Sequence, residues 1–262
     1  MSIYEFHRGS APLLISVPHA GTEVPPEILQ RLAPHARELP DTDWYVHQLY
    51  AFARDLGASI IKANFSRYVV DLNRASDSAP LYPSGPNSPV CPTTTFAGEP
   101  LYEHGGVPSD AEVSARVEKY WQPYHQRIAE ELVRIKAEHG RALLWDAHSI
   151  ASEIPGLFDG KLPEFNLGTR DDASCPREIA ESLLHTVQAG GQFSAVLNGR
   201  FKGGYITKGY GNPAAGIYAI QLELSQRAYM SEIPRGPWEP ARAQGAARCI
   251  EQLLRQYLSF AN

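Results

Sequence analysis

The sequence predicts a three-layer α/β protein, in which helices cover both faces of a mostly parallel sheet. The first observation is a set of short apolar runs of strand length, at residues 12–17, 58–63, 67–72, 141–149, 193–198 and 217–224. The second is that segments of helical period lie between them or follow them, at 41–57, 109–139, 175–187 and 240–258. Strands that alternate with helices are typical of a sheet covered on both sides.

Local signals place the ends of the predicted helices. The letters SDAE at 109–112 form a capping box, in which Ser109 caps the helix and Glu112 reaches back. Pro123 is expected to kink this long helix, and Gly140 to end it. Gly57 is the expected stop of the helix at 41–57.

Length and composition limit the kind of protein and its partners. The chain has 262 residues, of which 43% are hydrophobic, so residues 1–262 are expected to form a single domain. No apolar run approaches the roughly 18 residues that span a bilayer, and the N-terminus does not resemble a signal peptide, so no membrane partner is expected. A net charge of −5 without a basic run argues against a nucleic-acid partner. Three widely spaced cysteines predict free thiols in a reducing cytoplasm.

Two histidines and an aspartate are candidate metal ligands. His19 follows the apolar run at 12–17, and His148 lies at the end of the run at 141–149. With Asp43 they make a common ligand set for catalytic Zn²⁺, which keeps a fourth position for water. Each residue also has an ordinary interpretation, because a histidine can bond a turn and Asp41 and Asp43 can cap the helix that follows.

Glu223 is the candidate general base. It lies in the apolar run at 217–224, between Leu222 and Leu224, where a carboxylate is costly unless it is paired or functional. Burial would raise its pKa toward the range that suits a general base. Gln221 and Ser225 share its strand face, so this face is expected to line the site.

Two arginines and a histidine are further candidates. Arg74, with Asn73 beside it, follows the run at 67–72 and offers a planar fork that matches a carboxylate, although a surface salt bridge would also suit it. Arg67 could polarise a carbonyl or pair with an acid. His104 lies in a long segment without clear period, residues 75–108, from which it could approach a substrate.

The chain resembles the N-formylglutamate amidohydrolase family from about Leu13 to Met230. The phrases that carry the resemblance are VPHAG, LPDTDW, SRYVVDLNR, PLYEHG, LLWDAHSI, LFDGKLPEFNLGT, LNGRFKGGYIT and QLELSQRAYM. The resemblance implies a zinc-carboxypeptidase-like α/β/α fold with a mostly parallel mixed sheet and one catalytic zinc ion. It also implies hydrolysis of N-formyl-L-glutamate to L-glutamate and formate, a reaction of bacterial histidine breakdown.

The resemblance also implies ligands for the metal. His19 and His148 match the metal histidines. Carboxypeptidases place a glutamate three residues after the first histidine, where this chain has Thr22, so the carboxylate must come from elsewhere. Asp43 is the expected ligand and Glu23 its competitor.

The same resemblance implies how the substrate is held. Asn73 and Arg74 resemble the pair that grips a substrate carboxylate, and Glu223 resembles the general base. A second substrate carboxylate would need another cation, for which the candidates are Lys202, Lys208 and Arg227. The expected partner is a small-molecule N-acyl amino acid. An amidohydrolase for another N-acyl amino acid is an alternative, and so is a non-catalytic binding protein, although binding alone needs no general base.

Overall fold

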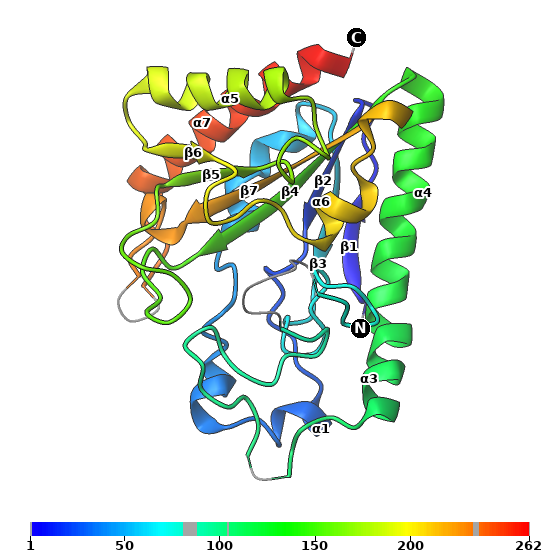
Figure 1. Ribbon diagram of the computed structural model, residues 1–262, viewed down its shortest axis with the longest axis vertical. Helices are drawn as coiled ribbons and strands as arrows, with labels where there is room; N and C mark the ends of the chain where they lie inside the picture. Colours follow the sequence, from blue (N-terminus) through cyan, green and yellow to red (C-terminus); the bar gives the residue numbers. More distant parts are fainter. Residues whose placement is uncertain (1, 81–87, 104, 233–235, 262) are drawn as a thin grey trace.

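The structure is a computed structural model that describes residues 2–80, 88–103, 105–232 and 236–261. Its centre is a seven-stranded sheet with the order β1-β3-β2-β4-β7-β5-β6 (Figure 1). The strands are β1 Tyr4–His7, β2 Leu13–Val17, β3 Ser59–Ala63, β4 Ala142–Ile150, β5 Phe165–Gly168, β6 Ala195–Leu197 and β7 Ile217–Ser225.

The middle of the sheet is parallel and its flanks introduce the antiparallel pairs. Strands β3, β2, β4 and β7 run parallel to their neighbours in this block. At one edge β1 is antiparallel to β3, and on the other side β5 is antiparallel to β7 and parallel to β6. The sheet is therefore mixed and mostly parallel, which confirms the predicted fold class.

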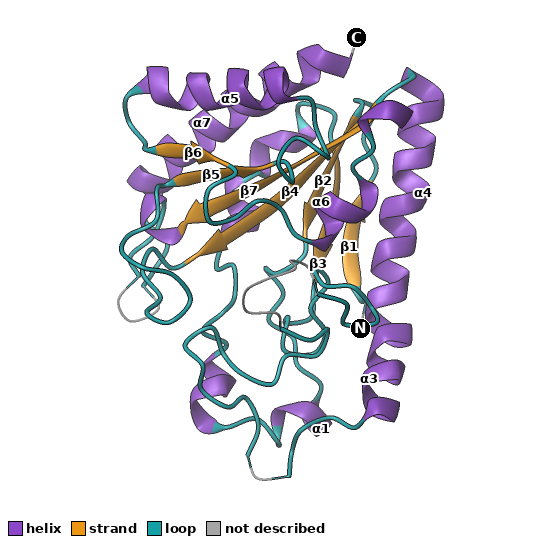
Figure 2. Ribbon diagram, viewed as in Figure 1, coloured by secondary structure: helices purple, strands orange, loops and turns teal. Residues whose placement is uncertain are grey.

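Helices cover both faces of the sheet (Figures 1 and 2). Helices α2 (Val46–Leu49), α5 (Arg177–Gly190) and α7 (Pro240–Leu258) pack on one face, while α4 (Gln122–His139) and α6 (Tyr205–Tyr210) pack on the other. Strand alternation divides the core accordingly. Leu143 and Trp145 of β4 join the cluster with α5 and α7, and Leu144 joins the cluster with α4.

The remaining helices are short or continue α4. Helix α3 (Asp110–Arg116) begins at Ser109, whose side chain accepts a hydrogen bond from the backbone N–H of Glu112. The Glu112 carboxylate pairs with Arg31 and Arg116, so only the capping half of the predicted box is present. The single-turn helices are α1 Pro26–Leu29, η1 Pro34–Glu38, η2 Ala51–Arg54, η4 Pro213–Ala215, η5 Gln226–Ala228 and η6 Ser259–Ala261.

A π-helical turn joins α3 to α4, where the sequence predicted a kink. The turn covers Val117–Trp121, and Pro123 lies in the first turn of α4. Proline has no N–H to donate and its ring crowds the carbonyl four residues earlier, and the wider turn accommodates both effects. Gly140, with φ of 79°, ends α4 as predicted.

Two predicted elements differ in the structure. Residues 67–72 form no strand: they make turns, because Arg67 and Asp71, four residues apart, are drawn into an ion pair. The helix predicted at 41–57 is reduced to α2 and η2, and Tyr45, with φ of 59°, stands in a left-handed conformation at its start. In the described part of the chain, no helix is both long and apolar enough to cross a membrane.

One face of the sheet becomes polar near the carboxyl ends of its central strands. On the side of α4 and α6, β4 and β7 place Asp146 opposite Gln221 and His148 opposite Glu223. Strand β5 adds Asn166, which lies opposite Glu223 from the other side. Ligand sites of open α/β sheets form at such carboxyl ends, so this edge is the place to look for function.

Candidate active site

His19 presents a free nitrogen to the interior. It follows β2 in a tight turn that needs Gly21, where a Cβ atom would lie 2.4 Å from the carbonyl oxygen of Phe65. The Nε2 of His19 lies 2.8 Å from Oδ1 of Asp71, and a carboxylate can only accept, so Nε2 carries the hydrogen. The Nδ1 is buried and has no hydrogen-bond partner among the described residues. A buried imidazole nitrogen left with a free lone pair is suited to a metal ion.

His148 lies on β4 between two carboxylates. Its Nε2 is 2.9 Å from Oδ2 of Asp146, and its Nδ1 is 3.1 Å from Oδ2 of Asp43. Burial lowers the pKa of His148, but the charges and hydrogen bonds of Asp146 and Asp43 outweigh it and raise that pKa well above its usual value. The negative charge of two carboxylates around one ring favours binding of a cation, whether a proton or a metal ion.

Asp43 completes a group that can hold a metal ion. Its Oδ2 accepts a hydrogen bond from the backbone N–H of Ser149 and lies 3.9 Å from Nδ1 of His19. One ligand atom from each of His19, Asp43 and His148 lies within 4.8 Å of the others, and all three residues are buried. Glu23 is outside this group.

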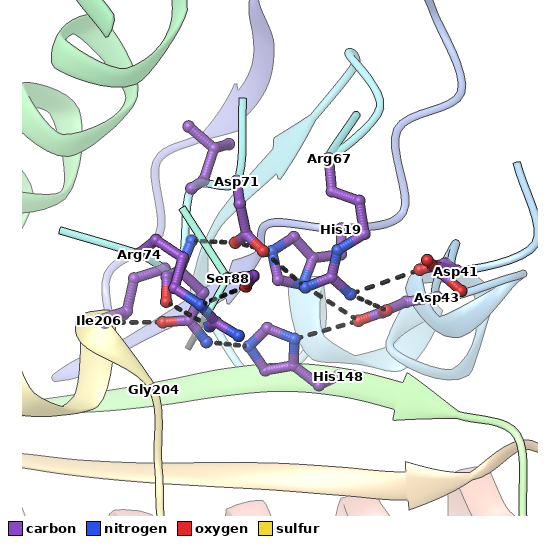
Figure 3. A network of polar contacts seen from close by, with 12 residues as sticks. His19, Asp41, Asp43, Arg67, Asp71, Arg74, Ser88, His148, Gly204 and Ile206 are labelled. Atoms are coloured by element: carbon purple, nitrogen blue, oxygen red, sulfur yellow. Dashed lines mark hydrogen bonds and ion pairs between the residues drawn. The ribbon is translucent and has the colours of Figure 1, made fainter. Parts of the chain in front are cut away.

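Asp71 and Arg67 contact the candidate metal ligands His19 and Asp43 (Figure 3). Arg67 donates to Oδ2 of Asp71 at 2.8 Å, and its other terminal nitrogen lies 3.8 Å from Oδ1 of Asp43. Burial opposes ionisation of Asp71, but the charge of Arg67 and the hydrogen bond from His19 hold its pKa well below the usual range. Burial lowers the pKa of His19. The pair is therefore an ionised carboxylate and a neutral imidazole, the state in which histidine binds metals.

Glu223 is buried next to this group in the sheet. Burial raises the pKa of Glu223 to about 8, and the nearby charge of Asp43 acts in the same direction, against that of His148. Gln221 donates to Oε2 of Glu223 at 3.0 Å and holds the side chain in place. A carboxylate that exchanges its proton near neutral pH can act as a general base.

Asn73 connects the histidine to α6. Its Oδ1 accepts from the backbone N–H of Ile206 at 2.8 Å, which turns its Nδ2 to donate to Asp146 Oδ2 at 3.3 Å, with His148 Nε2 2.9 Å away. The Asn73 amide is thus already bonded on both sides. Its expected contact with substrate remains a prediction.

Comparison with known proteins identifies the family of the chain. Residues 11–230 match the family model described as N-formylglutamate amidohydrolase. The chain belongs to this family. It is 49% identical over 258 residues to N-formylglutamate deformylases of Pseudomonas putida and Pseudomonas aeruginosa, covering 98% of this chain and 96% and 97% of theirs.

Solved structures share the fold of this amidohydrolase-family chain. An N-formylglutamate amidohydrolase from Ralstonia eutropha has a TM-score of 0.76 at 22% identity, over 100% of this chain and 98% of that one. A gene product of Agrobacterium tumefaciens has a TM-score of 0.75 at 18% identity, over 99% and 96% of the two chains. At these identities the likeness supports the α/β fold alone.

The side chains expected to bind the substrate carboxylates differ in whether they already form ion pairs within the protein. Arg74 is half-buried, donates to Ser88 Oγ and to the carbonyl of Asn73, each at 3.0 Å, and forms no ion pair within the described ranges. Arg227 pairs with Glu164 at 2.5 Å, and Lys202 pairs with Asp171 at 2.9 Å. Lys208 lines a cavity of about 250 Å³ beside the segment that follows Arg74. His104 lies outside the described residues.

Gly204 leads to a first prediction, because it leaves room for the Asn73 amide. A Cβ atom there would lie 2.2 Å from Nδ2 of Asn73. We expect Gly204→Ala to displace that amide, disturb His148 and lower kcat/KM by on the order of 10²-fold, the effect of a displacement of about 1 Å. Steady-state kinetics beside thermal unfolding measures this. Gly209→Ala, in the helix that Gly204 precedes as N-cap, is the control, since a Cβ atom there would be 3.6 Å from its nearest neighbour. Equal losses in both variants would contradict the prediction.

Proposed function

We propose that this protein hydrolyses N-formyl-L-glutamate to L-glutamate and formate in histidine breakdown, with one zinc ion held by His19, Asp43 and His148. The observation that carries the proposal is Glu223, a buried carboxylate with a pKa raised to about 8, opposite His148 in the sheet. A binding protein has no need of a base at that position. The names of the Pseudomonas relatives supply the substrate.

The residues present fit a zinc ion. Two imidazoles and one carboxylate are a frequent catalytic zinc set, and they leave a position for water. The hydrogen bond of His19 to Asp71 and that of His148 to Asp146 leave both Nδ1 atoms toward the common centre. Zinc bound there would make water a competent nucleophile near neutral pH and polarise a carbonyl group.

The protein's own groups move the proton and stabilise charge. Glu223 accepts the proton of the attacking water as the new bond forms at the formyl carbon. It then delivers that proton to the departing nitrogen of glutamate, and the carbon–nitrogen bond breaks. Arg67, buried beside Asp43, supplies positive charge that favours the oxyanion.

Specificity comes from the glutamate end, because a formyl group offers very little surface. Arg74 grips one carboxylate with its planar fork, and Asn73 holds the backbone and His148 in place beside it. Lys208 is the preferred cation for the second carboxylate, because Lys202 and Arg227 are already paired with acids. We also propose a cytoplasmic location, which the three free cysteines support.

Release of the free amino acid, which every substrate in a panel of N-acyl amino acids yields on hydrolysis, tests the proposal. We expect N-formyl-L-glutamate to be the best substrate, ahead of N-formyl-L-aspartate, N-acetyl-L-glutamate and N-succinyl-L-glutamate. A preference for another acyl group or amino acid would favour the related-amidohydrolase alternative. Stoichiometric zinc without turnover of any substrate would favour the non-catalytic alternative.

A second prediction concerns Arg74. Arg74→Lys keeps the charge but loses the two-pronged donor, so we expect kcat/KM for N-formyl-L-glutamate to fall by an amount equivalent to about 2–5 kcal/mol. Arg177→Lys, in an exposed arginine that pairs with Glu181, is the control and should leave the kinetics unchanged. An unchanged kcat/KM in Arg74→Lys would show that Arg74 does not bind the substrate.

A further inference from the structure

Three consecutive carbonyl groups of the segment 72–74 are each held by a donor from the helices on the α4 side. The carbonyl of Leu72 accepts from Nε2 of His125 at 2.8 Å, and that of Arg74 accepts from Nε1 of Trp121 at 2.9 Å. Between them, the carbonyl of Asn73 accepts from the backbone N–H of Tyr205 at 3.3 Å. The backbone that carries Asn73 and Arg74 is therefore fixed from outside the metal group.

Trp121 and His125 form one rigid unit. They lie four residues apart, on the same side of the helix, and their rings stack with centroids 3.7 Å apart and planes at 26°. Tyr205 and Tyr210 close around His125, with centroid distances of 5.4 and 5.9 Å. These contacts leave the two side chains little rotational freedom.

His125 is a neutral donor in this unit. Burial lowers the pKa of His125 to about 3, so its ring stays uncharged at physiological pH. The carbonyl of Leu72 can only accept, so the single ring hydrogen lies on Nε2. Nδ1 lies 2.9 Å from the Tyr210 hydroxyl, which can donate to it. His125 therefore contributes a hydrogen bond to the Leu72 carbonyl and carries no charge.

The π-helical turn sets the direction of this unit. The turn ends at Trp121. A π turn holds one residue more than an α turn, so the side chains that follow it are shifted around the helix axis by about 100° relative to those of α3. Such turns are rare and frequent at functional sites. Here the turn delivers an indole N–H to the carbonyl of Arg74.

We propose that Trp121 and His125 are positioning residues that aim the Arg74 guanidinium at the substrate carboxylate by holding the backbone at Leu72 and Arg74. This inference rests on the proposed function of Arg74. The guanidinium of Arg74 donates to the carbonyl of Asn73. A shift of the 72–74 backbone therefore moves the substrate-binding guanidinium with it.

A double-mutant cycle tests the inference. Trp121→Phe keeps an aromatic ring and removes the N–H, so we expect KM for N-formyl-L-glutamate to rise roughly 3–10-fold, the equivalent of one lost hydrogen bond, with kcat within about twofold. In the Arg74→Lys background the same substitution should change KM less than about twofold, because its effect passes through Arg74. Equal effects in both backgrounds would overturn the inference.

Matched variants separate positioning from stability. His125→Phe removes the donor to the Leu72 carbonyl and should raise KM, whereas His125→Gln retains a donor and should raise KM less. Leu132→Ala, two turns further along α4 and buried in the same core, should lower thermal stability without raising KM. A rise in KM in Leu132→Ala equal to that in Trp121→Phe would reduce the role of Trp121 to packing.

Hydrogen exchange gives a readout that does not depend on the substrate. Backbone amides in a peptide spanning residues 71–75 should exchange faster in Trp121→Phe than in wild type, and at the wild-type rate in Leu132→Ala. Wild-type protein that releases no formate would refute the proposed function. Unchanged exchange in Trp121→Phe would refute the positioning role, whatever the activity.

Discussion

Glu223→Gln is expected to lower kcat by roughly 10²–10⁴-fold while leaving the fold and the bound metal intact. The amide has nearly the shape of the carboxylate and can still accept the hydrogen bond that Gln221 donates, but it cannot take a proton from water. KM should change much less, because the lost interaction belongs to the transition state. Kinetics and metal analysis on the same preparation measure both effects.

The pH–rate profile adds a check on the same residue. A general base must be ionised, so activity should fall as pH drops through the pKa of Glu223. Burial raises that pKa to about 8, and a divalent cation held by the neighbouring histidines would lower it, since opposite charge favours the carboxylate. The acidic limb should vanish from the residual activity of Glu223→Gln. Near-normal kcat in that variant would assign proton transfer to another acid, with Asp146 the next candidate.

His19→Ala should abolish metal binding and turnover together. The substitution removes the buried Nδ1, which forms no hydrogen bond within the part of the chain that the structure describes. Asp71 keeps its bonds to Arg67 and to the backbone of Asn73, so the fold should persist. Zinc per chain, formate release and circular dichroism measure the three properties.

The control for His19→Ala is His139→Ala, at the exposed end of α4, which should retain both metal and activity. His19→Ala protein that still carries a full equivalent of tightly bound zinc and turns over normally would show that the ligands are elsewhere.

The central strands and their polar residues were predictable because burial leaves a strong pattern. Strands β4 and β7 are parallel and buried on both faces, so they read as continuous apolar runs in the sequence. His148 and Glu223 interrupt those runs, and such an interruption is costly without a function. The sequence therefore indicated both residues, although only the register of the sheet shows that they lie opposite one another.

The segment around Asp71 was beyond sequence reasoning for a physical reason. Val69 and Val70 gave residues 67–72 the composition of a strand, but the ion pair of Arg67 with Asp71 and the bond of Asp71 to His19 favour turns there. The bond between Asp71 and His19 joins residues far apart in the sequence, and no local propensity encodes it. The support that Asp71 gives to His19 was missed with it, and its only sequence signal was an acid inside an apolar run. Strands β1 and β5, of four residues each, were too short to show a period.

Titration of metal-depleted protein with zinc, followed by formate release from N-formyl-L-glutamate, tests the central claim most directly. We expect activity to rise from near zero in proportion to added zinc and to level off at one equivalent per chain. Glu223→Gln should bind the same single equivalent and remain nearly inactive. Full activity in protein shown to hold no metal would contradict a zinc-dependent hydrolysis. Wild-type activity in Glu223→Gln would contradict the role of Glu223 as the base.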